Sequence, residues 1–537
     1  MLLRLIVSSA LTLGAYVFYR AIKTVYAELT SPLRHLPGPK STHRLLGNIL
    51  DLRNGGSSGL EDRWVQQYGR TMKVHVLFGA AALYSMDIKA VHHILFNTQI
   101  YQKPASMRFN LGRIVGPGIL VVEGDVHKQQ RKIMNPAFGA PQIRELTGIF
   151  VEKSIQLRDI WAAQAAQNGG IVRVEVFSWL SKATLDIIGL AGFNYKINAL
   201  GARSEDEPNE LAAAFETLFV INNGLDPLRA LQGRFPIFRH ISTKSKMVTR
   251  DAQATMMRIG RKLLADSKRD IAETGTFETG RARDLLNLLV RANTSKEIPE
   301  HQRLSDEDVL AQVPTFLVAG HETTSTAMTW ALFALTQNKA AQTRLRTELQ
   351  SVETENPTLD ELNGLRYLDC VVRETLRVHS PVPSTLRVSL CDDIVPLANP
   401  FTDAQGTVHE SIRVPKGTQV FIPISTMNRD PEIWGPDSND FVPERWESPI
   451  SSSVPGIWGN MMTFFGGPRS CIGYRFSLAE MKALLFTLIR DLEFELAVPI
   501  SDVGKKSTSV TQAPVLNSDL KAGNQLPLLV RQVVRSS

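Results

Sequence analysis

FFGGPRSCIG, the stretch from Phe464 to Gly473, is a loop rich in glycine and proline that leads into a strongly helical segment, Phe476–Arg490. The loop brings Cys471 close to the start of that helix. Backbone N–H groups and the positive end of the helix dipole lower the pKa of a thiol in such a position and stabilise the thiolate. Gly467 and Gly473 permit the close backbone approach that a flat cofactor lying on the loop would require. The stretch therefore predicts that Cys471 is a thiolate ligand of a metal.

The overall composition is that of a folded globular protein. The chain has 537 residues, of which 43% are hydrophobic and 21% are charged, and this balance excludes a largely disordered or collagen-like chain. The formal net charge is +7, but the basic residues are scattered rather than gathered in a tract, so we expect no nucleic-acid partner. A basic balance suits an anionic membrane surface or an acidic protein partner, and equally a solvated surface without specific meaning.

The cysteine count excludes a disulfide framework. Only Cys370, Cys391 and Cys471 occur, and none of them forms a CxxC or Cys/His cluster with zinc-like spacing. We therefore expect a reducing compartment and no structural metal site. We interpret Cys370 and Cys391 as small buried residues of the core.

The amino terminus carries an apolar run without charge from Leu5 to Tyr19, flanked by Arg4 and Arg20. A helix of this length falls short of a hydrocarbon core of about 30 Å, but snorkelling arginines and the apolar residues that follow can extend it to a span. A cleaved signal peptide is the alternative. Aromatic residues near the end of the run favour a retained anchor over residues 1–29, and the basic residues after it place the rest of the chain in the cytosol.

The segment LPGP at residues 36–39 follows the anchor, and its prolines stop any continuing helix. Beyond it we find no repeat and no low-complexity linker, so we predict one large catalytic domain over residues 30–537. We predict a mainly α fold with a small β part (α+β). Helices are expected over Glu210–Val220, Asp284–Ala292 and Asp308–Gln337, and strands near Met72–Ser85, Leu386–Cys391 and Gln419–Ile424, with a hairpin after Ser501.

One long central helix is expected to begin at SDED, residues 305–308, and to run through AGHETT, residues 319–324. Gly320 removes bulk from its middle, and threonine hydroxyls there compete for backbone carbonyls, so that a small pocket can open. Pro314 lacks an N–H group and predicts a kink about two turns before Glu322.

The cysteine loop resembles the haem-binding pattern FxxGxRxCxG of the cytochrome P-450 family, with matches at Phe464, Gly467, Arg469, Cys471 and Gly473. The resemblance covers essentially the whole chain. It implies the P-450 fold and haem b, iron protoporphyrin IX, with Cys471 as the axial ligand whose electron donation favours O–O cleavage. It further implies that Phe464 shields the thiolate and that Arg469 binds a haem propionate, which an arginine fork suits well.

Three further motifs resemble family elements in the expected order. Residues 319–324 look like the family's oxygen-activation motif, which implies that Glu322 and Thr323 form a proton relay, a task for which a carboxylate and a hydroxyl are suited. Glu374 and Arg377 resemble the ExxR element, and FVPERW at residues 441–446 resembles its partner motif.

The resemblance implies that Arg445 completes a structural triad with the ExxR pair. A buried network of this kind must be fully paired to be tolerated. We therefore assign the triad to the folding of the haem pocket rather than to chemistry.

Arg387 and Arg131 match the positions of two other propionate-binding arginines of the family. The helix that carries Arg131 resembles the WxxxR element, but His127 stands where the family has tryptophan. An imidazole N–H can replace the indole N–H as a donor, with less stacking area and with titration near neutral pH. Asn428 is a second departure, at a position where the family often has histidine.

The resemblance implies a membrane-bound oxidoreductase that inserts one atom of O2 into an apolar small molecule. The electrons would come from NADPH through a cytochrome P-450 reductase, with cytochrome b5 as an additional donor. The motifs resemble those of fungal microsomal members, which implies a single-pass protein of the endoplasmic reticulum membrane and a role in secondary metabolism, with a terpenoid as substrate.

Two alternatives remain at this point. One keeps the fold but not oxygen activation and is a haem-thiolate isomerase, dehydratase or peroxygenase. The other is a membrane-anchored haem- or sterol-binding protein without catalysis. The sequence names neither the substrate nor the oligomeric state.

Overall fold

The computed structural model describes the chain from Ser31 onward with short gaps. The gaps are residues 44, 55–58, 203–208, 215–216, 218–227, 229–231, 234, 242, 275–283, 295–298, 300–302, 404, 451–453, 508–509 and 534–537. Among residues 1–30 it describes only 8, 11–12, 14–16, 18–19, 22, 26 and 30, so most of the predicted anchor lies outside the described residues, as does much of the helix predicted over Glu210–Val220.

The chain forms two compact units. The first unit comprises Met1–Pro104, Ser384–Met427 and Gly466–Arg469, and the second comprises Ala105–Pro383, Asn428–Phe465 and Ser470–Ser537. The predicted single domain over residues 30–537 stays a prediction.

The first unit contains a five-stranded sheet with the order β1-β2-β8-β5-β3, in which only β2 and β8 are parallel. Its strands are β1 (Thr71–His75), β2 (Ala81–Ser85), β3 (Tyr101–Gln102), β5 (Thr385–Ser389) and β8 (Gln419–Ile422). A separate hairpin pairs β6 (Asp393–Thr402) with β7 (Val408–Val414). The helical elements are η1 (Pro32–His35), α2 (Ile49–Asn54), α3 (Leu60–Tyr68), η3 (Leu77–Gly79), α4 (Ile88–Phe96), α18 (Ile424–Met427) and η8 (Gly467–Arg469).

Asp87 ties α4 to the β6–β7 hairpin. Its fully buried carboxylate accepts the N–H of Ala90 at 2.9 Å, which caps the helix, and those of Ala398 and Asn399 on β6. A cap of this kind satisfies helix donors that would otherwise lack a partner. The helix in turn positions η8, because Gly467 has φ +69° and lies so close to the Leu95 carbonyl that a Cβ would stand 2.8 Å from it.

The second unit is mainly helical and holds the largest core. Its helices are α5 (Ala105–Val115), α6 (Gly124–Met134), α7 (Ala140–Gln167), α8 (Val176–Phe193), α11 (Lys244–Thr274), α12 (Leu285–Thr294), α13 (Asp306–Leu310), α14 (Gln312–Gln337), α15 (Lys339–Gln350), α16 (Leu359–Gly364), α17 (Arg366–Val378), α19 (Pro431–Trp434) and α20 (Tyr474–Asp491). Short 3-10 helices are η4 (Asn135–Phe138), η5 (Pro236–His240), η7 (Pro443–Glu447), η9 (Ile500–Asp502) and η10 (Asn517–Asp519).

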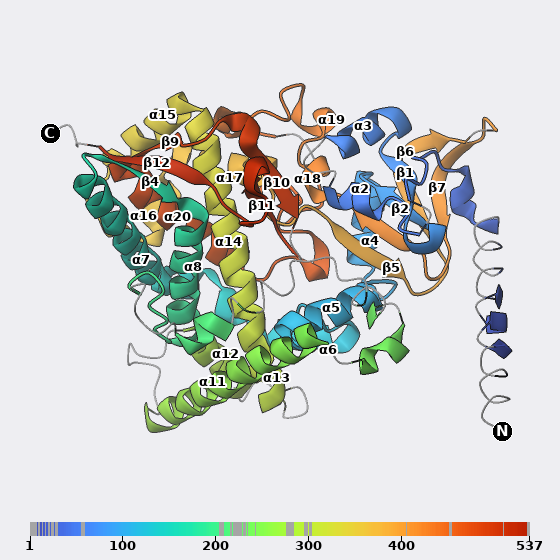
Figure 1. The fold of residues 1–537 in the computed structure, drawn as a ribbon, viewed down its shortest axis with the longest axis horizontal. Helices are drawn as coiled ribbons and strands as arrows, with labels where there is room; N and C mark the ends of the chain where they lie inside the picture. The colour runs from blue at the N-terminus through green and yellow to red at the C-terminus, as the bar shows by residue number, and fades with distance from the viewer. Residues whose placement is uncertain are drawn as a thin grey trace. The chain divides into compact units, whose positions relative to one another are not determined.

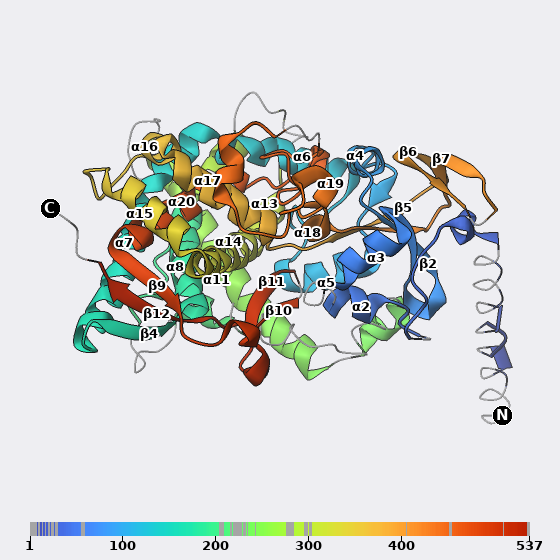
Figure 2. The same cartoon turned by 90° about the horizontal axis from the view of Figure 1, so that it is seen from above.

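Two small antiparallel sheets complete the second unit. One has the order β4-β12-β9, from Ile171–Glu175, Pro527–Gln532 and Leu492–Leu496. The other is the hairpin of β10 (Val503–Ser507) and β11 (Gln512–Leu516). Helix α7 packs against β4 and β12 (Figure 2). The predicted fold class, mainly α with a small β part, is confirmed, and so are the strands predicted near 72–85, 386–391 and 419–424 and the carboxyl-terminal hairpin.

Helix α14 runs through the interior of the second unit and packs against α8, α17 and α20 (Figure 1). The predicted cap at Ser305 is confirmed as a capping box with Asp308, but the helix it starts, α13, ends at Leu310 and α14 begins at Gln312. Pro314 explains the interruption, since its ring displaces the carbonyl four residues earlier, that of Leu310, and it offers no N–H to that oxygen.

Among the described residues, one helix, α8, is long and apolar enough to cross a membrane. Two-thirds of it, 67%, is buried inside the second unit. Its packing against α14 and α7 is that of a core helix.

Gly118, in the loop between α5 and α6, allows a test of the close packing of this loop against α14. A Cβ at this position would lie 2.1 Å from the Thr315 hydroxyl and 2.7 Å from the Ala311 carbonyl. We expect Gly118→Ala to lower the free energy of unfolding by about 1–3 kcal/mol through overpacking. Gly112→Ala is the control, because its Cβ would meet only Val121 at 3.7 Å. Equal thermal denaturation midpoints for the two variants would contradict the close approach.

Candidate active site

The cysteine loop closes on itself and leads directly into α20. The N–H of Cys471 donates to the carbonyl of Phe464 at 2.9 Å, and the buried Phe464 ring packs against Trp458 and Tyr474. Helix α20 begins at Tyr474, with Gly473 as its N-cap and no side-chain cap. The Cys471 thiol is thus fixed by its backbone just before a helix start, and its side chain is only partly buried.

Burial has the largest effect on the pKa of the Cys471 thiol. Desolvation raises that pKa, while the Gly473 N–H and the positive charge of Arg131 lower it in part. The N–H at the helix start thus lowers the pKa as expected, but the lost hydration of the thiolate outweighs the two favourable contacts, so the net shift is upward. A coordinated metal cation removes the thiol proton outright, so the thiolate form depends on metal binding.

Helix α6 brings Arg131 to the cysteine loop. The Arg131 guanidinium donates to the carbonyl of Ser470 and to the side chain of Asn135, the latter at 2.9 Å. Burial lowers the pKa of Arg131. His127 lies one turn earlier on the same helix face and is buried, 5% exposed. The structure thus brings Arg131, one of the predicted propionate ligands, next to Cys471.

The middle of α14 is partly exposed, although the helix is buried on both sides of it. Ala319, Gly320 and Thr323 are partly exposed, in a helix that is otherwise almost wholly buried. The Thr323 hydroxyl donates to the Ala319 carbonyl at 2.6 Å, a back-bond that threonine makes within helices. Gly320 has a packing role in addition to the predicted reduction of bulk, because a Cβ there would lie 2.9 Å from Ile188 on α8.

Contacts of aromatic and hydroxyl groups join the cysteine loop to α14. A Cβ on Gly473 would lie 3.7 Å from Phe138, whose ring meets Phe316 of α14 edge to face at 5.4 Å. Six residues after the cysteine, the Ser477 hydroxyl lies 3.2 Å from that of Thr324. Cys471 and the partly exposed face of α14 therefore belong to one connected region of the second unit.

Glu322 and His321 point into different parts of the core. Glu322 is 5% exposed, and its Oε1 accepts the Thr511 hydroxyl at 2.6 Å. His321 Nε2 lies 2.6 Å from the Ser181 hydroxyl on α8. Burial lowers the pKa of His321 to about 4, so the imidazole is neutral at ordinary pH and places no positive charge beside Glu322.

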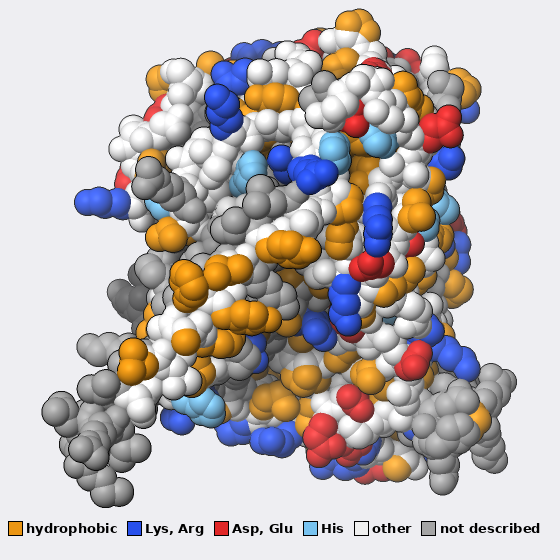
Figure 3. Space-filling view, turned by 90° about the vertical axis from the view of Figure 1, so that its right-hand side faces the viewer, with side chains coloured by type: hydrophobic (Ala, Val, Ile, Leu, Met, Phe, Trp, Pro, Cys, Tyr) orange, Lys and Arg blue, Asp and Glu red, His pale blue; other side chains and the backbone are white. Residues whose placement is uncertain are grey.

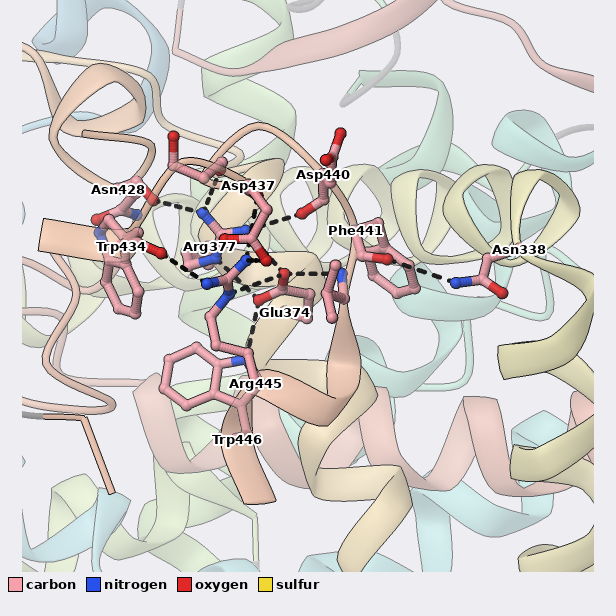
Figure 4. Close-up of polar contacts among 12 residues, drawn as sticks. Asn338, Glu374, Arg377, Asn428, Trp434, Asp437, Asp440, Phe441, Arg445 and Trp446 are labelled. Carbon is pink, nitrogen blue, oxygen red and sulfur yellow. Dashed lines mark hydrogen bonds and ion pairs between the residues drawn. The ribbon is translucent and has the colours of Figure 1, made fainter. Parts of the chain in front are cut away.

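The predicted triad of Glu374, Arg377 and Arg445 is assembled around one buried carboxylate (Figure 4). Glu374 and Arg377 are both fully buried and form a bidentate pair with distances of 2.8 and 2.7 Å. Arg445 Nε lies 3.6 Å from Glu374 Oε1, and the Trp446 indole N–H donates to Oε2 at 2.9 Å. The N–H of Val442 donates to Glu374 Oε1 at 2.9 Å. Four groups therefore converge on the Glu374 carboxylate, from Arg377, Val442, Arg445 and Trp446.

Arg377 uses all five of its N–H donors. Besides the two bonds to Glu374, it donates to the carbonyls of Asn428, Ser438 and Asp440 at 3.0, 2.5 and 2.9 Å. Arg445 donates to the Trp434 carbonyl and pairs with Asp437 at 2.7 Å. The network is fully paired at Arg377, as a buried charge requires.

The first unit contains the other two predicted propionate ligands. Arg387 lies on β5 and is buried, and its Nη1 donates to the Thr385 hydroxyl at 2.7 Å and to the Leu386 carbonyl at 2.9 Å. Arg469 is the last residue of η8 and is partly exposed.

The residues of the second unit fit a haem group. Cys471, a partly exposed residue, lies beside a guanidinium that can pair with a carboxylate, and the aromatic rings of Phe138 and Phe316 lie next to Gly473 and on α14. A family model described as Cytochrome P450 matches residues 37–517. The chain belongs to the cytochrome P450 family.

Curated relatives of this P450 are fungal enzymes. Cytochrome P450 monooxygenase 128 of Postia placenta is 49% identical over 98% of this chain and 97% of its own length. Cytochrome P450 monooxygenase 205 of the same fungus is 49% identical over 96% of each chain. Cytochrome P450 monooxygenase claO of Ampulloclitocybe clavipes is 35% identical over 94% of each chain.

The family membership confirms three predictions. The resemblance to the cytochrome P-450 family, the assignment as a P450 enzyme and the cofactor, haem b held by a cysteine thiolate, all follow from it. The roles of single residues stay predictions.

Sequence reasoning missed two buried groups near α14 of this P450. Glu480 on α20 is fully buried, and Thr511 precedes β11. A glutamate inside the apolar run of α20 could have signalled the first. No local pattern could have found the second, because Thr511 is 189 residues from its partner Glu322.

Asn428, noted in the sequence as a departure from the family, uses both of its side-chain donors and its acceptor oxygen. Its amide donates to the hydroxyls of Ser380 and Thr463 at 2.8 and 2.7 Å, and its oxygen accepts the Met462 N–H at 2.8 Å. An asparagine at this position therefore links α17 to the segment that leads into the cysteine loop.

Arg377→Lys tests the dependence of the fold on the five donors of Arg377. Lysine has three donors, so at least two buried acceptors lose their partner, at about 1–3 kcal/mol each. We expect a markedly lower thermal denaturation midpoint and loss of the reduced carbon monoxide spectrum. Arg366→Lys, at an exposed position of the same helix, is the control. A normal midpoint for Arg377→Lys would show that the network is dispensable.

Glu480→Gln tests the charge state of the buried carboxyl group. Burial raises the pKa of Glu480 well above 4.5, and the Thr324 hydroxyl offsets this only in part. Because the folded state then keeps a proton that the unfolded state has lost, stability falls as pH rises from about 4.5 through the folded pKa. We expect Glu480→Gln to lose less stability than wild type between pH 5 and 8, measured by denaturation midpoints.

The control for Glu480 is Glu152→Gln, whose side chain is 69% exposed. Its pH dependence should match that of wild type. A Glu480→Gln protein with the wild-type slope would show that Glu480 is charged in the folded state.

Proposed function

We propose that this P450 is a monooxygenase of an apolar small molecule. The supporting observation is that a partly exposed thiol, Cys471, and the partly exposed middle of α14, with the Glu322–Thr323 pair, belong to one connected region. In the proposed reaction one atom of O2 enters a C–H bond of the substrate. The other atom leaves as water with two electrons from NADPH and two protons, one of which NADPH supplies with its hydride.

Haem b supplies the activation of dioxygen when it is bound. We propose that Cys471 is its thiolate ligand, that Phe464 shields this sulfur, and that Arg131 binds a propionate. The close approach of Arg131 to Ser470, next to the cysteine, supports its role. Arg387, Arg469 and His127 have the same proposed role at the propionates on the basis of the family pattern.

Glu322 and Thr323 are proposed to hold and move protons. Thr323 is partly exposed on the open face of α14, and its hydroxyl can leave the Ala319 carbonyl because a helical back-bond costs little to break. Glu322 is buried beside it and is within reach of a hydroxyl donor. A carboxylate behind an exposed hydroxyl is an arrangement that can feed protons into a dry site.

The proposed substrate is apolar because the described residues around this region are mainly apolar or small. Phe316 and Phe138 meet edge to face, and Ala319 lies in the partly exposed stretch of α14. The fungal relatives are named as monooxygenases without a substrate. Secondary metabolism, with a terpenoid as substrate, is the narrower proposal.

We further propose a single-pass anchor over residues 1–29 and a catalytic domain on the cytosolic face of the endoplasmic reticulum. The described positions of this segment include hydrophobic side chains that are exposed, among them Tyr16, Phe18 and Ile22 at 56%, 68% and 52%. Figure 3 shows hydrophobic side chains exposed on this side of the molecule. Large apolar side chains in contact with water favour a lipid environment. The proposed electron donor is a membrane-bound NADPH–cytochrome P450 reductase, with cytochrome b5 as a second donor.

The test is expression of the full chain with a reductase in a strain that contains neighbouring biosynthetic genes. We expect a new product that carries one oxygen atom from isotopically labelled O2 and that requires NADPH. A product formed without NADPH and without the label would instead indicate an isomerase or dehydratase, and one supported by hydrogen peroxide alone a peroxygenase. Absent product and absent NADPH consumption would favour a binding protein.

Cys471→Ser tests the proposed ligand directly. We expect the reduced carbon monoxide complex to lose the red-shifted Soret band of a thiolate ligand, because serine offers no thiolate. Cys391→Ser is the matched control. The prediction that Cys391 is buried is wrong, because the residue is exposed, so its loss should leave the band intact. A Cys471→Ser protein that keeps the band would exclude Cys471 as the ligand.

A further inference from the structure

Thr511 makes a direct contact with the acid of the oxygen-activation motif. It lies immediately before β11, and its hydroxyl donates to Glu322 Oε1 at 2.6 Å. Thr511 is 1% exposed and Glu322 is 5% exposed. An O–H donor at this distance is typical of a charge-assisted bond to a carboxylate, which is roughly twice as strong as a bond between neutral groups.

The backbone around Thr511 is fixed from two directions. The N–H of Gln512 donates to the Pro381 carbonyl at 2.8 Å, and the Gln512 carbonyl accepts the indole N–H of Trp330 at 2.9 Å. Trp330 lies on α14, two turns beyond Glu322, and stacks on His379 with ring centroids 4.7 Å apart. The same helix that carries the acid therefore also holds the residue next to Thr511.

The strand that follows adds to this rigidity. Every residue of β11 is buried, and β11 pairs along its length with β10. A hydroxyl on so fixed a backbone has little freedom beyond its χ1 rotamers, which are restricted in threonine. The position of the donor is thus set by packing and not by the carboxylate that accepts from it.

We propose that Thr511 is the positioning residue that orients the Glu322 carboxylate for proton delivery. The inference rests on the proposed function, in which Glu322 delivers protons. A buried carboxylate on a helix has several rotamers, and a fixed donor on a separate element selects one of them.

The effect of Thr511 on proton delivery can be measured without knowing the substrate. In the absence of substrate, the enzyme with reductase reduces O2 in one of two ways. O2 with one NADPH and one proton gives H2O2 and NADP+, whereas O2 with two NADPH and two protons gives two H2O and two NADP+. Water formation takes up more protons at the oxygen atoms, so oriented delivery favours water over peroxide.

The experiment uses Thr511→Val in the full chain, in membranes with reductase, NADPH and O2. Valine keeps the shape and removes the donor. We expect the ratio of water to peroxide, measured as O2 consumed and H2O2 released per NADPH, to fall about tenfold, the effect of losing one charge-assisted hydrogen bond. Thr511→Ser keeps the donor and should restore the wild-type ratio.

The controls separate positioning from folding. Thr329→Val removes a buried hydroxyl from α14 that bonds only its own helix, at Ser325, and should leave the ratio unchanged. All ratios are normalised to haem measured by the reduced carbon monoxide spectrum. A purely structural Thr511 would lower haem content without altering the ratio, and that result overturns the proposal. Thr511→Ala serves as a second donor-free variant if the valine protein retains too little haem.

Glu322→Gln separates the proposed role of Glu322 in proton delivery from the proposed positioning role of Thr511. We expect it to lower the water-to-peroxide ratio at least as far as Thr511→Val, and we expect the double variant to show no further decrease. An unchanged ratio in Glu322→Gln would show that the proposed role of Glu322 is wrong, and the inference would fall with it. Two results would overturn the role of Thr511 alone. One is a water-to-peroxide ratio that changes in Glu322→Gln but not in Thr511→Val. The other is a double variant in which the effects of the two substitutions multiply.

Discussion

The buried pair of Glu374 and Arg377 is the interaction on which the position of the cysteine depends. Arg377 donates to the carbonyl of Asn428, and the Asn428 side chain accepts the N–H of Met462. Thr463, the next residue, donates to the Leu376 carbonyl at 2.7 Å, one residue before Arg377. These bonds fix the segment that ends at Phe464, whose carbonyl accepts the N–H of Cys471. An ion pair 97 positions before the cysteine in sequence, counted from Glu374, thus determines where the sulfur lies.

Such a pair is tolerated only because nothing in it is left unsatisfied. Removal of two charges from water is expensive, and their attraction repays this only with near-ideal geometry and with partners for the remaining donors and lone pairs. Arg377 meets this condition with five bonds, three of them to backbone carbonyls of the segment 428–440. The requirement explains why an irregular segment without long helices or strands can be rigid. Its carbonyls are the acceptors that the guanidinium needs, so the segment and the ion pair stabilise each other.

The sequence predicted the elements whose determinants are local. The capping box at Ser305, the break associated with Pro314 and the helix after the cysteine loop depend on neighbouring residues, and each has its counterpart in the structure. The triad residues could be named from their motifs, but the indole donor of Trp446 and the carbonyls of residues 428–440 could not, because those contacts join segments that are distant in sequence. The helix start that lowers the pKa of Cys471 is visible in the sequence, but the burial that raises this pKa is not, because burial depends on the whole core.

Two buried carboxyl groups near the middle of α14 have different donors. Glu480 approaches from α20, where burial raises its pKa and the Thr324 hydroxyl offsets this only in part. Glu322 lies on α14 itself and accepts a short hydrogen bond from the Thr511 hydroxyl. A low-dielectric site can hold one charge that is well bonded, but a second charge nearby would be repelled and would lack donors. A buried carboxyl group therefore depends on the donors that reach it, and the donor that distinguishes Glu322 from Glu480 is the hydroxyl of Thr511.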